Sequence, residues 1–252
     1  MAQNNGAALA GQTALVTGGA RRIGARLVRA LHAAGADVVI HCRRSREAAD
    51  ELAAALDTER PGSTAVVTGD LLDPDACGQV VEAARALRGR LDIVVNNAST
   101  FYPTAVGTIT AAAFDDLIGS NLRAPTFVAQ AAAPALRETG GCIVNMADIH
   151  GQRPLADHPV YCAAKAGLIM LTKSLARDLA PTVRVNAIAP GSILWPEGPG
   201  GDDPGTRAAV LAATPLARQG DPDDIAAAQR YLVGNAPFVT GQILAVDGGR
   251  GL

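Results

Sequence analysis

Short apolar runs alternate with longer, Ala-rich amphipathic segments from residue 13 onward, and this alternation constrains the fold more than any other feature. A β-α-β-α order is typical of a parallel, doubly wound sheet of about seven strands with helices on both faces. A chain of 252 residues with 48% hydrophobic composition can bury one large core, so we expect a single α/β domain over residues 1–252. The runs with the length and composition of buried strands are Thr13–Thr17, Asp37–Cys42, Thr64–Thr68, Leu91–Asn96, Cys142–Ala147, Val183–Ile188 and Ile243–Val246.

Charge and composition exclude several classes of partner. The net charge of −2 gives no electrostatic footprint for a nucleic acid or an anionic membrane. The first ten residues have no basic start and no apolar run of signal-peptide length, and no later stretch approaches a membrane span. We therefore expect a cytoplasmic protein that binds no nucleic acid and no membrane. The cysteines lack C-x-x-C pairing and the histidines lack metal-ligand spacing, so we expect core thiols and no metal site.

A glycine-rich turn, Thr17–Gly24, follows the first predicted strand and opens the next helical segment. Its glycines let the backbone approach a pyrophosphate, and the N-terminus of the following helix offers free N–H groups. Arg21 and Arg22 place cations where the helix dipole is already positive, which favours an anion nearby. The alternative is that both arginines are solvated residues at a helix start. The turn predicts a dinucleotide site in a Rossmann-like domain.

The end of the second strand, where such a domain distinguishes between its cofactors, carries Arg43, Arg44 and Ser45. An Asp or Glu there would accept hydrogen bonds from the ribose 2′-hydroxyl and repel a phosphate, and the sequence has neither. Two guanidinium groups and a hydroxyl favour a 2′-phosphate instead. We therefore predict NADPH as the cofactor. The alternative is that the arginines cap an exposed strand end.

Tyr161 and Lys165 are four residues apart in a predicted helix, so their side chains share one face. An ammonium group that close is expected to lower the pKa of the phenol and make Tyr161 a general acid. Asp148 ends a predicted strand 13 residues before Tyr161. An ionised carboxylate only accepts hydrogen bonds, so Asp148 suits the N–H groups of a nitrogen heterocycle better than a ketone oxygen. The alternatives are a chance Tyr and Lys spacing and a structural ion pair for Asp148.

The chain resembles the classical short-chain dehydrogenase/reductases in short segments that follow one another in the order typical of that family. These segments are Gly18–Gly24, Asn96–Ala98, Asn121, Tyr161 with Lys165, and Pro190–Gly191. Within the family the details look like the pteridine reductases, in Thr17–Gly24, Asn97–Pro103, Asn145–Asp148, Tyr161 and Lys165. The resemblance runs from about Thr13 to Gly249. One departure is Arg22, which stands where the familiar motif has a glycine and where the pteridine reductases look to have an arginine.

The resemblance implies a role for each matching residue. Tyr161 would donate the proton, helped by Lys165 and Asp148, while Asn121 would hold a water beside the lysine and kink its own helix. The cofactor-binding residues implied are Gly18, Arg22, Ile23, Arg43, Arg44, Ser45, Asp70, Leu71, Asn97, Ala98, Ser99, Tyr161, Lys165, Pro190, Gly191 and Ser192. The substrate-binding residues implied are Arg22, Ser99, Phe101, Asp148, Tyr161 and Trp195.

Two loops complete the predicted site. Phe101 and Tyr102 stand out in a chain that is 3% aromatic, in a loop at the carboxyl end of a strand, where ligands bind in such folds. The resemblance implies that Phe101 stacks on a pterin against the nicotinamide; a hydrophobic loop anchor is the alternative, above all for Tyr102. The stretch Trp195–Gly205 is too rich in Pro and Gly for a regular element. We expect residues 192–213 to form a substrate lid that includes a helix near Thr206–Ala213, with a disordered excursion as the alternative.

Together these features predict an NADPH-dependent pteridine reductase that converts dihydropterins to tetrahydropterins, with dihydrofolate as a further candidate substrate. The same-class alternative is an NADPH-dependent carbonyl reductase such as a 3-oxoacyl reductase. A cofactor-sensing regulator that has kept the fold is the alternative from a different class. The region Phe238–Gly249 resembles the last strand of the family, which usually packs against a partner subunit, so the resemblance implies a homotetramer.

Overall fold

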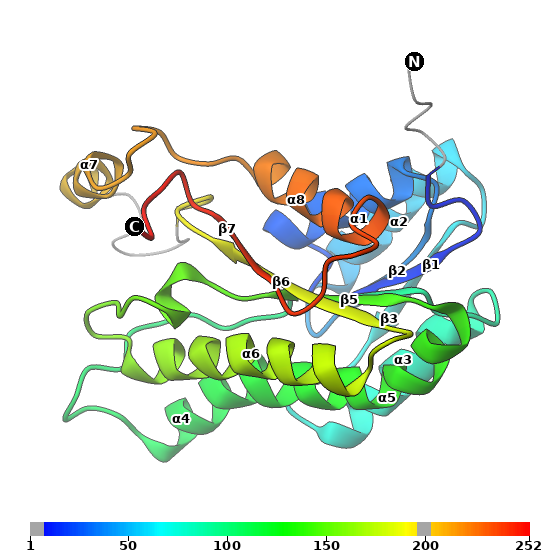
Figure 1. The fold of residues 1–252 in the computed structure, drawn as a ribbon, viewed down its shortest axis with the longest axis horizontal. Helices are drawn as coiled ribbons and strands as arrows, with labels where there is room; N and C mark the ends of the chain where they lie inside the picture. Colours follow the sequence, from blue (N-terminus) through cyan, green and yellow to red (C-terminus); the bar gives the residue numbers. More distant parts are fainter. Residues whose placement is uncertain (1–7, 196–202) are drawn as a thin grey trace.

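A computed structural model describes residues 8–195 and 203–252. Its centre is a single seven-stranded sheet in the order β3-β2-β1-β4-β5-β6-β7, in which every neighbouring pair is parallel (Figure 1). This is the predicted doubly wound sheet. The strands are β1 Thr13–Val16, β2 Asp37–Cys42, β3 Thr64–Thr68, β4 Ile93–Asn96, β5 Cys142–Met146, β6 Arg184–Pro190 and β7 Ile243–Val246.

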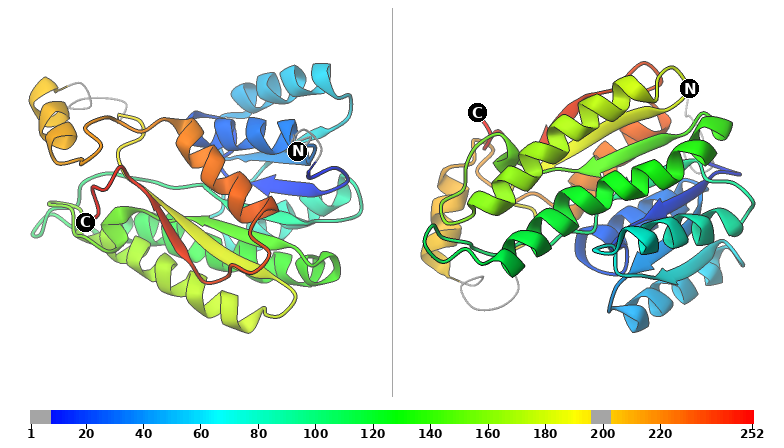
Figure 2. Two further views of the ribbon diagram at one scale, coloured as in Figure 1. Left: turned by 45° about the horizontal axis from the view of Figure 1, so that its top comes forward. Right: turned by 90° about the horizontal axis from the view of Figure 1, so that it is seen from below.

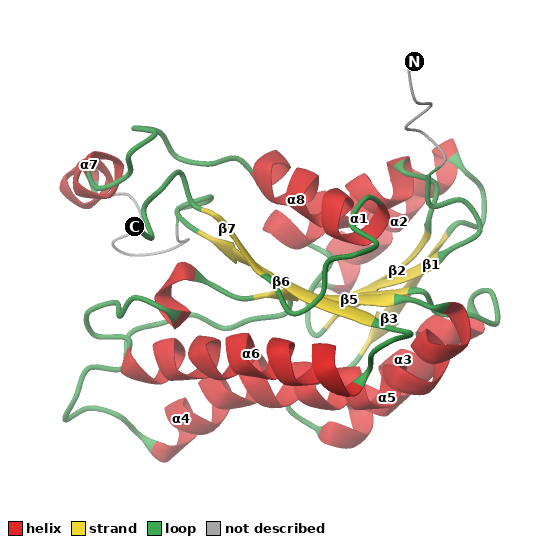
Figure 3. Cartoon of the chain, viewed as in Figure 1, coloured by secondary structure: helices red, strands yellow, loops and turns green. Residues whose placement is uncertain are grey.

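Helices cover both faces of the sheet, so that three layers result (Figure 3). In Figure 1, α1, α2 and α8 lie on one face, and α3, α4, α5 and α6 lie on the other. The helices are α1 Arg22–Ala33, α2 Arg46–Glu59, α3 Pro74–Ala86, α4 Ala111–Ile118, α5 Ala124–Thr139, α6 Pro159–Asp178, α7 Pro204–Ala212 and α8 Pro222–Gly234, with a π-helical turn η1 Gly119–Arg123 and a 3₁₀ turn η2 Ile149–Gly151.

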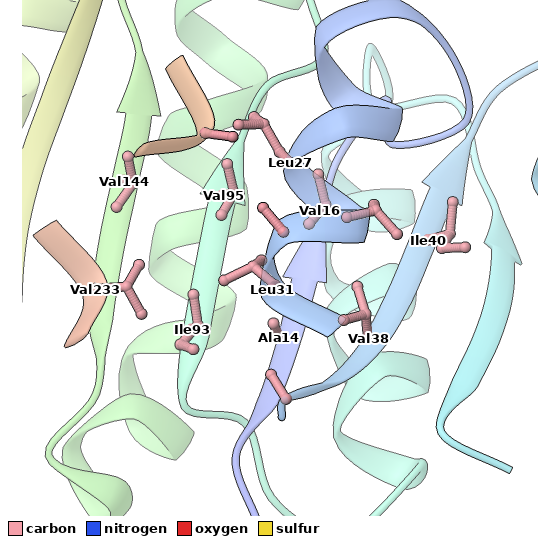
Figure 4. Close-up of a cluster of buried hydrophobic side chains, with 14 of the residues drawn as sticks. Ala14, Val16, Leu27, Leu31, Val38, Ile40, Ile93, Val95, Val144 and Val233 are labelled. Atoms are coloured by element: carbon pink, nitrogen blue, oxygen red, sulfur yellow. The ribbon is translucent and has the colours of Figure 1, made fainter. Parts of the chain in front are cut away.

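The core explains why the apolar runs become strands. Alternate residues of each central strand point to opposite faces, and both faces are covered, so a continuous run of apolar side chains is buried. Figure 4 shows Leu27 and Leu31 of α1 against Ala14 and Val16 of β1 and neighbouring strand residues. All four side chains are fully buried. Each large side chain buried in this way contributes roughly 1.5–3 kcal/mol.

Four predicted strands differ from the structure at their ends. The first and fifth end one residue earlier, at Val16 and Met146, and the sixth begins one residue later, at Arg184. The fourth strand begins at Ile93 rather than Leu91, and just before it the carboxylate of Asp92 accepts the backbone N–H of Thr13 at 2.8 Å. The sixth strand extends to Pro190, because it continues to pair with β7 as far as Val246. The longer β6 carries its carboxyl end further toward the site described below.

The segment predicted to form a lid is only partly described, since residues 196–202 lie outside the described residues. The helix expected near Thr206–Ala213 is present as α7, and Asp203 caps it by accepting the Thr206 N–H at 2.7 Å. Figure 2 shows α7 at one end of the molecule, beyond the two helical layers. Over the described ranges, no helix combines the length and apolar character needed to cross a membrane.

Candidate active site

The carboxyl ends of the strands bring most of the predicted site residues together around three cavities that share lining residues. A cavity of about 200 Å³ lies over the ends of β1, β2 and β3, and a second of about 460 Å³ lies between the β4, β5 and β6 loops and α7. Between them is a pocket of about 180 Å³ that holds Tyr161 and Lys165. Ser99 lines all three. An elongated ligand that extended through these cavities would therefore have Ser99 beside its middle.

Tyr161, Lys165 and Asp148 form the polar centre of this region. The Tyr161 hydroxyl donates to Asp148 Oδ2 at 2.8 Å, and Asp148 Oδ1 accepts the backbone N–H of His150 at 2.8 Å. Lys165 Nζ donates to the Met146 carbonyl at 2.7 Å and lies 5.6 Å from the centre of the Tyr161 ring. Both Tyr161 and Lys165 are buried. The shared helix face expected from their spacing is present in α6.

The electrostatics of this centre correct one expectation. Burial and the adjacent Asp148 carboxylate raise the pKa of Tyr161 well above its usual value. Burial lowers the pKa of Lys165 to about 8, although Asp148 acts in the opposite direction. The prediction that Lys165 lowers the pKa of Tyr161 is therefore wrong for this structure, because the nearest charge to the phenol is a carboxylate and the ammonium donates to a carbonyl. Tyr161 is a protonated donor that Asp148 orients.

Asn121 interrupts the helix that precedes the centre, as expected. It lies in the π-helical turn η1 and is buried. Its side-chain amide donates to the carbonyls of Leu117 and Thr100 at 3.0 and 2.9 Å, and its oxygen accepts the Ser99 hydroxyl at 2.6 Å. An inserted residue of this kind is common at functional sites. The Asn121 side chain thus connects its own helix to the loop after β4 and to Ser99, which lines all three cavities.

The glycine-rich turn has the close backbone approach that a pyrophosphate requires. Gly18 has φ of +61°, and a Cβ added there would lie 2.9 Å from Ala98 Cα. A Cβ at Gly24 would lie 2.2 Å from the Gly18 carbonyl oxygen. The Asn97 side-chain amide donates to that same oxygen at 3.0 Å. These contacts exclude side chains from the turn and leave the start of α1 facing the cavities, so the turn fits an anionic dinucleotide.

Arg22 adopts a conformation that usually belongs to glycine, with φ of +53°. This agrees with its place in the motif, where the familiar residue is a glycine. A side chain in the left-handed region costs about 1–2 kcal/mol. The guanidinium donates to the Trp195 carbonyl at 3.0 Å and lines the 460 Å³ cavity with Asp148 and Phe101. The same residue therefore has a strained backbone and a guanidinium group that lines the site.

We expect Arg22→Gly to stabilise the fold while it damages ligand binding. Glycine removes the strain, and its extra freedom in the unfolded chain offsets part of the gain, so the unfolding free energy should rise by roughly 0.5–1 kcal/mol. Urea denaturation of the ligand-free protein measures this. Arg22→Ala is the matched control, because it removes the same guanidinium but keeps the strain. Equal stabilities for the glycine and alanine variants would contradict the explanation.

Of the three residues predicted to select the cofactor, Arg43 lines the 200 Å³ cavity. Arg43 Nη1 lies 3.5 Å from Asp70 Oδ1, and both side chains, together with Leu71, line the cavity. Arg44 is exposed, and Ser45 stands at the N-cap of α2. This end of the site thus has two guanidinium groups, and that of Arg43 pairs with Asp70.

The aromatic loop after β4 gives different roles to its two rings. Phe101 is 46% exposed, stacks on His158 with ring centres 4.7 Å apart, and meets Tyr161 edge-on at 4.8 Å. Tyr102 points elsewhere, donating to Asp116 Oδ2 at 3.0 Å, so it anchors the loop to α4. The loop-anchor alternative therefore holds for Tyr102, while Phe101 faces the large cavity.

Comparison with known proteins agrees with this geometry. A family model described as "Enoyl-(Acyl carrier protein) reductase", of the short-chain dehydrogenase type, matches residues 18–250. The chain belongs to the short-chain dehydrogenase/reductase family. It is 37% identical to the L-xylulose reductase of Mus musculus, over 96% of this chain and 97% of that protein. It is 34% identical to pteridine reductase 1 of Leishmania tarentolae, over 95% of this chain and 96% of that protein.

A solved structure of the family gives the same fold. The crystal structure of a blue fluorescent protein from a metagenomic library, in complex with NADPH, has a TM-score of 0.90 and 34% identity. The alignment covers 96% of this chain and 98% of that one. Membership of the short-chain dehydrogenase/reductases makes the chain an oxidoreductase, and the turn and cavities described above fit a nicotinamide cofactor.

The remaining predicted residues line the pocket of Lys165 and the cavity beside it. Ile23, Asn97, Pro190 and Gly191 line the pocket that holds Lys165. Ser192 and Trp195 line the larger cavity beside them. A Cβ at Gly191 would lie 2.7 Å from Asp247 Cα, so only glycine fits there. Groups of three or more His, Cys, Asp or Glu side chains arranged for a metal ion do not occur in the described part of the chain.

Sequence reasoning missed two histidines of the site. His158 stacks on Phe101, and His41 lies beneath the glycine-rich turn. Their only sequence signal is position: His41 is a polar residue inside an apolar strand, and His158 precedes the helix that carries Tyr161. Neither spacing corresponds to a known motif, so the sequence alone did not assign them a role.

Proposed function

We propose that this short-chain dehydrogenase/reductase is an NADPH-dependent pteridine reductase that converts dihydropterins to tetrahydropterins, with dihydrofolate as a further candidate substrate. The observation that carries the proposal is the hydrogen bond between Tyr161 and Asp148 in a cavity that also contains Phe101 and Arg22. A carboxylate at this point accepts hydrogen bonds and suits the amino and N–H groups of a pterin. A ketone oxygen would face an acceptor there and gain nothing from it.

Each residue of the cavity then has a defined task. NADPH, when bound, would supply the hydride that reduces a carbon of the pterin pyrazine ring. Tyr161 donates its proton to the adjacent ring nitrogen, and Asp148 keeps the phenol oriented and binds the N–H edge of the ring. Lys165 holds its ammonium 5.6 Å from the centre of the Tyr161 ring, anchored by its hydrogen bond to the Met146 carbonyl. Phe101 offers a face or edge for stacking, and Arg22 meets the oxygen or nitrogen acceptors of the heterocycle.

A carbonyl reductase is the second candidate, because the chain is 37% identical to L-xylulose reductase and 34% identical to pteridine reductase 1. NADPH oxidation followed by absorbance decides between them. We expect oxidation with dihydrobiopterin and little or none with L-xylulose or an acetoacetyl thioester. If a ketone is reduced and pterins are ignored, the carbonyl-reductase assignment replaces ours.

The aromatic contact gives a sharper test of the substrate class. Phe101→Ala should weaken binding of a diaminopteridine inhibitor by roughly 1–3 kcal/mol, the range for the loss of one stacked ring. Phe114→Ala is the matched control, because Phe114 is 48% exposed on α4 and does not line the cavity. The inhibition constant of the diaminopteridine, measured in competition with the pterin substrate, gives the effect of each variant. Equal constants for the parent and the Phe101 variant would contradict a stacked pterin.

NADPH selection is attributed to Arg43, Arg44 and Ser45. Charged hydrogen bonds contribute about 1.5–3 kcal/mol each, so NADPH should bind tighter than NADH by several kcal/mol. Arg44→Asp should shift the ratio of kcat/KM toward NADH, because its carboxylate would repel the 2′-phosphate. Arg46→Asp is a suitable control, since Arg46 already pairs with Asp50 along α2. Equal kcat/KM for both cofactors in the parent would remove the assignment.

Two parts of the proposal concern the surroundings of the site. Trp195, Thr206, Arg207 and Val210 line the large cavity, which supports a lid function for residues 192–213. β7 is an edge strand of the sheet, and the Phe238 side chain that precedes it is fully exposed. These features support a homotetramer built through the last strand, which light scattering of the purified protein would test.

A further inference from the structure

His41 lies at the carboxyl end of β2 and connects the loops that follow β1 and β3. Its Nδ1 accepts the backbone N–H of Gly18 at 3.2 Å, and its Nε2 lies 3.1 Å from the Gly69 carbonyl oxygen. The His41 carbonyl also accepts the N–H of Gly19 at 2.9 Å. The side chain is 2% exposed. One buried residue therefore ties three neighbouring strand ends together.

The two side-chain contacts require one protonation state. Gly69 offers an acceptor, so Nε2 must carry the proton, and Gly18 offers a donor, so Nδ1 must present its lone pair. An imidazolium would set an N–H at Nδ1 against the N–H of Gly18. Burial lowers the pKa of His41, while the Gly69 carbonyl and Asp70 oppose that shift. The charged groups at this rim are Asp70 after β3 and Arg43 directly after β2, and they pair with each other.

The bridge stands in the wall of the 200 Å³ cavity, which Gly18, His41, Arg43, Asp70 and Leu71 line. We propose that His41 is a positioning residue for the cofactor, because its neutral imidazole fixes the separation of the Gly18 turn and the Gly69–Leu71 loop between which the adenosine half binds. His41 acts through these loops and not at the reacting atoms. The proposal depends on a nicotinamide cofactor and holds whichever substrate the enzyme reduces.

Two variants separate this role from simple packing. His41→Phe keeps a ring but neither hydrogen bond, and His41→Asn can present its side-chain oxygen to the Gly18 N–H in place of Nδ1. Fluorescence titration with NADPH should give a Kd about tenfold higher or more for the Phe variant, since a buried N–H loses its partner. The Asn variant should recover part of that loss. At saturating NADPH, kcat should stay within about twofold of the parent for both variants.

The pH dependence supplies a readout that a packing role would not change. Protonation of the imidazole should raise the parent's Kd for NADPH more steeply than that of His41→Asn between about pH 7.5 and pH 5. The ratio of the parent's Kd to that of His41→Asn cancels the titration of the cofactor's 2′-phosphate, which affects both Kd values equally. An unchanged Kd in the Phe variant, an Asn variant as weak as Phe, or a ratio constant with pH would each overturn the proposal. If the Phe variant does not fold, the Asn ratio decides alone.

Discussion

Tyr161→Phe should lower kcat for dihydropterin reduction by a factor on the order of 10²–10⁴, the usual contribution of a general acid. The hydroxyl is the group that donates to Asp148, while the ring packs edge-on against Phe101 and is retained by phenylalanine. The loss should therefore fall on kcat, and the Kd for NADPH should stay close to the parental value. Steady-state kinetics with a fluorescence titration measures both quantities.

Tyr102→Phe is a matched control for that variant. It removes a hydroxyl from the same neighbourhood, but that hydroxyl anchors the loop to Asp116 and does not point at the polar centre. Its turnover should stay near the parental rate. A Tyr161→Phe enzyme that keeps near-parental turnover would mean that another acid supplies the proton.

Asp148→Ser should reduce kcat/KM for dihydropterins by roughly 10- to 100-fold, because a charged hydrogen bond to the substrate contributes about 1.5–3 kcal/mol. The same change removes the carboxylate that raises the pKa of Tyr161, so that pKa should fall. The alkaline limb of the pH–rate profile that belongs to Tyr161 should therefore move to lower pH in the variant. Serine can still cap the 3₁₀ turn that Asp148 begins, so the fold should tolerate it.

Asp148→Asn provides the comparison for charge alone. Its side-chain oxygen can still accept the His150 N–H, yet it no longer carries a negative charge beside Tyr161. The pKa of Tyr161 should fall in this variant too, while NADPH binding stays unchanged in both. The carbonyl-reductase alternative would be established by two results together. The parent would not reduce pterins, and Asp148→Ser would reduce a 3-oxoacyl thioester better than the parent does.

The sequence predicted the scaffold closely, since a fully covered parallel strand must be a continuous apolar run. Three predicted strands, Asp37–Cys42, Thr64–Thr68 and Ile243–Val246, have the predicted limits. The other four differ only at their ends. Those ends lie beside tertiary contacts, such as the hydrogen bond from the Thr13 N–H to the Asp92 carboxylate before β4. The residues around Tyr161 were likewise predicted, because spacing on a helix fixes which side chains share a face.

The electrostatics of the site could not be predicted in the same way. The effect of Lys165 on Tyr161 depends on where its ammonium points, and the Met146 carbonyl that receives it belongs to β5. The φ of +53° at Arg22 follows from the turn as a whole and not from the residue itself. His41 resembles any buried strand residue until three strand ends are seen to meet around it. These are tertiary relations, which local sequence patterns do not encode.

The burial of Lys165 links folding to alkalinity in the ligand-free protein. An unfolded lysine keeps its proton up to about pH 10.4, whereas this one loses it near pH 8, so the unfolded chain binds more protons between these values. The unfolding free energy contributed by Lys165 therefore rises with pH across that window, by roughly 3 kcal/mol in all. The ammonium group beside the Tyr161 ring loses its charge over the same range. We therefore expect alkaline solution to stabilise the fold by removing a buried charge, while the site beside Tyr161 loses its ammonium group.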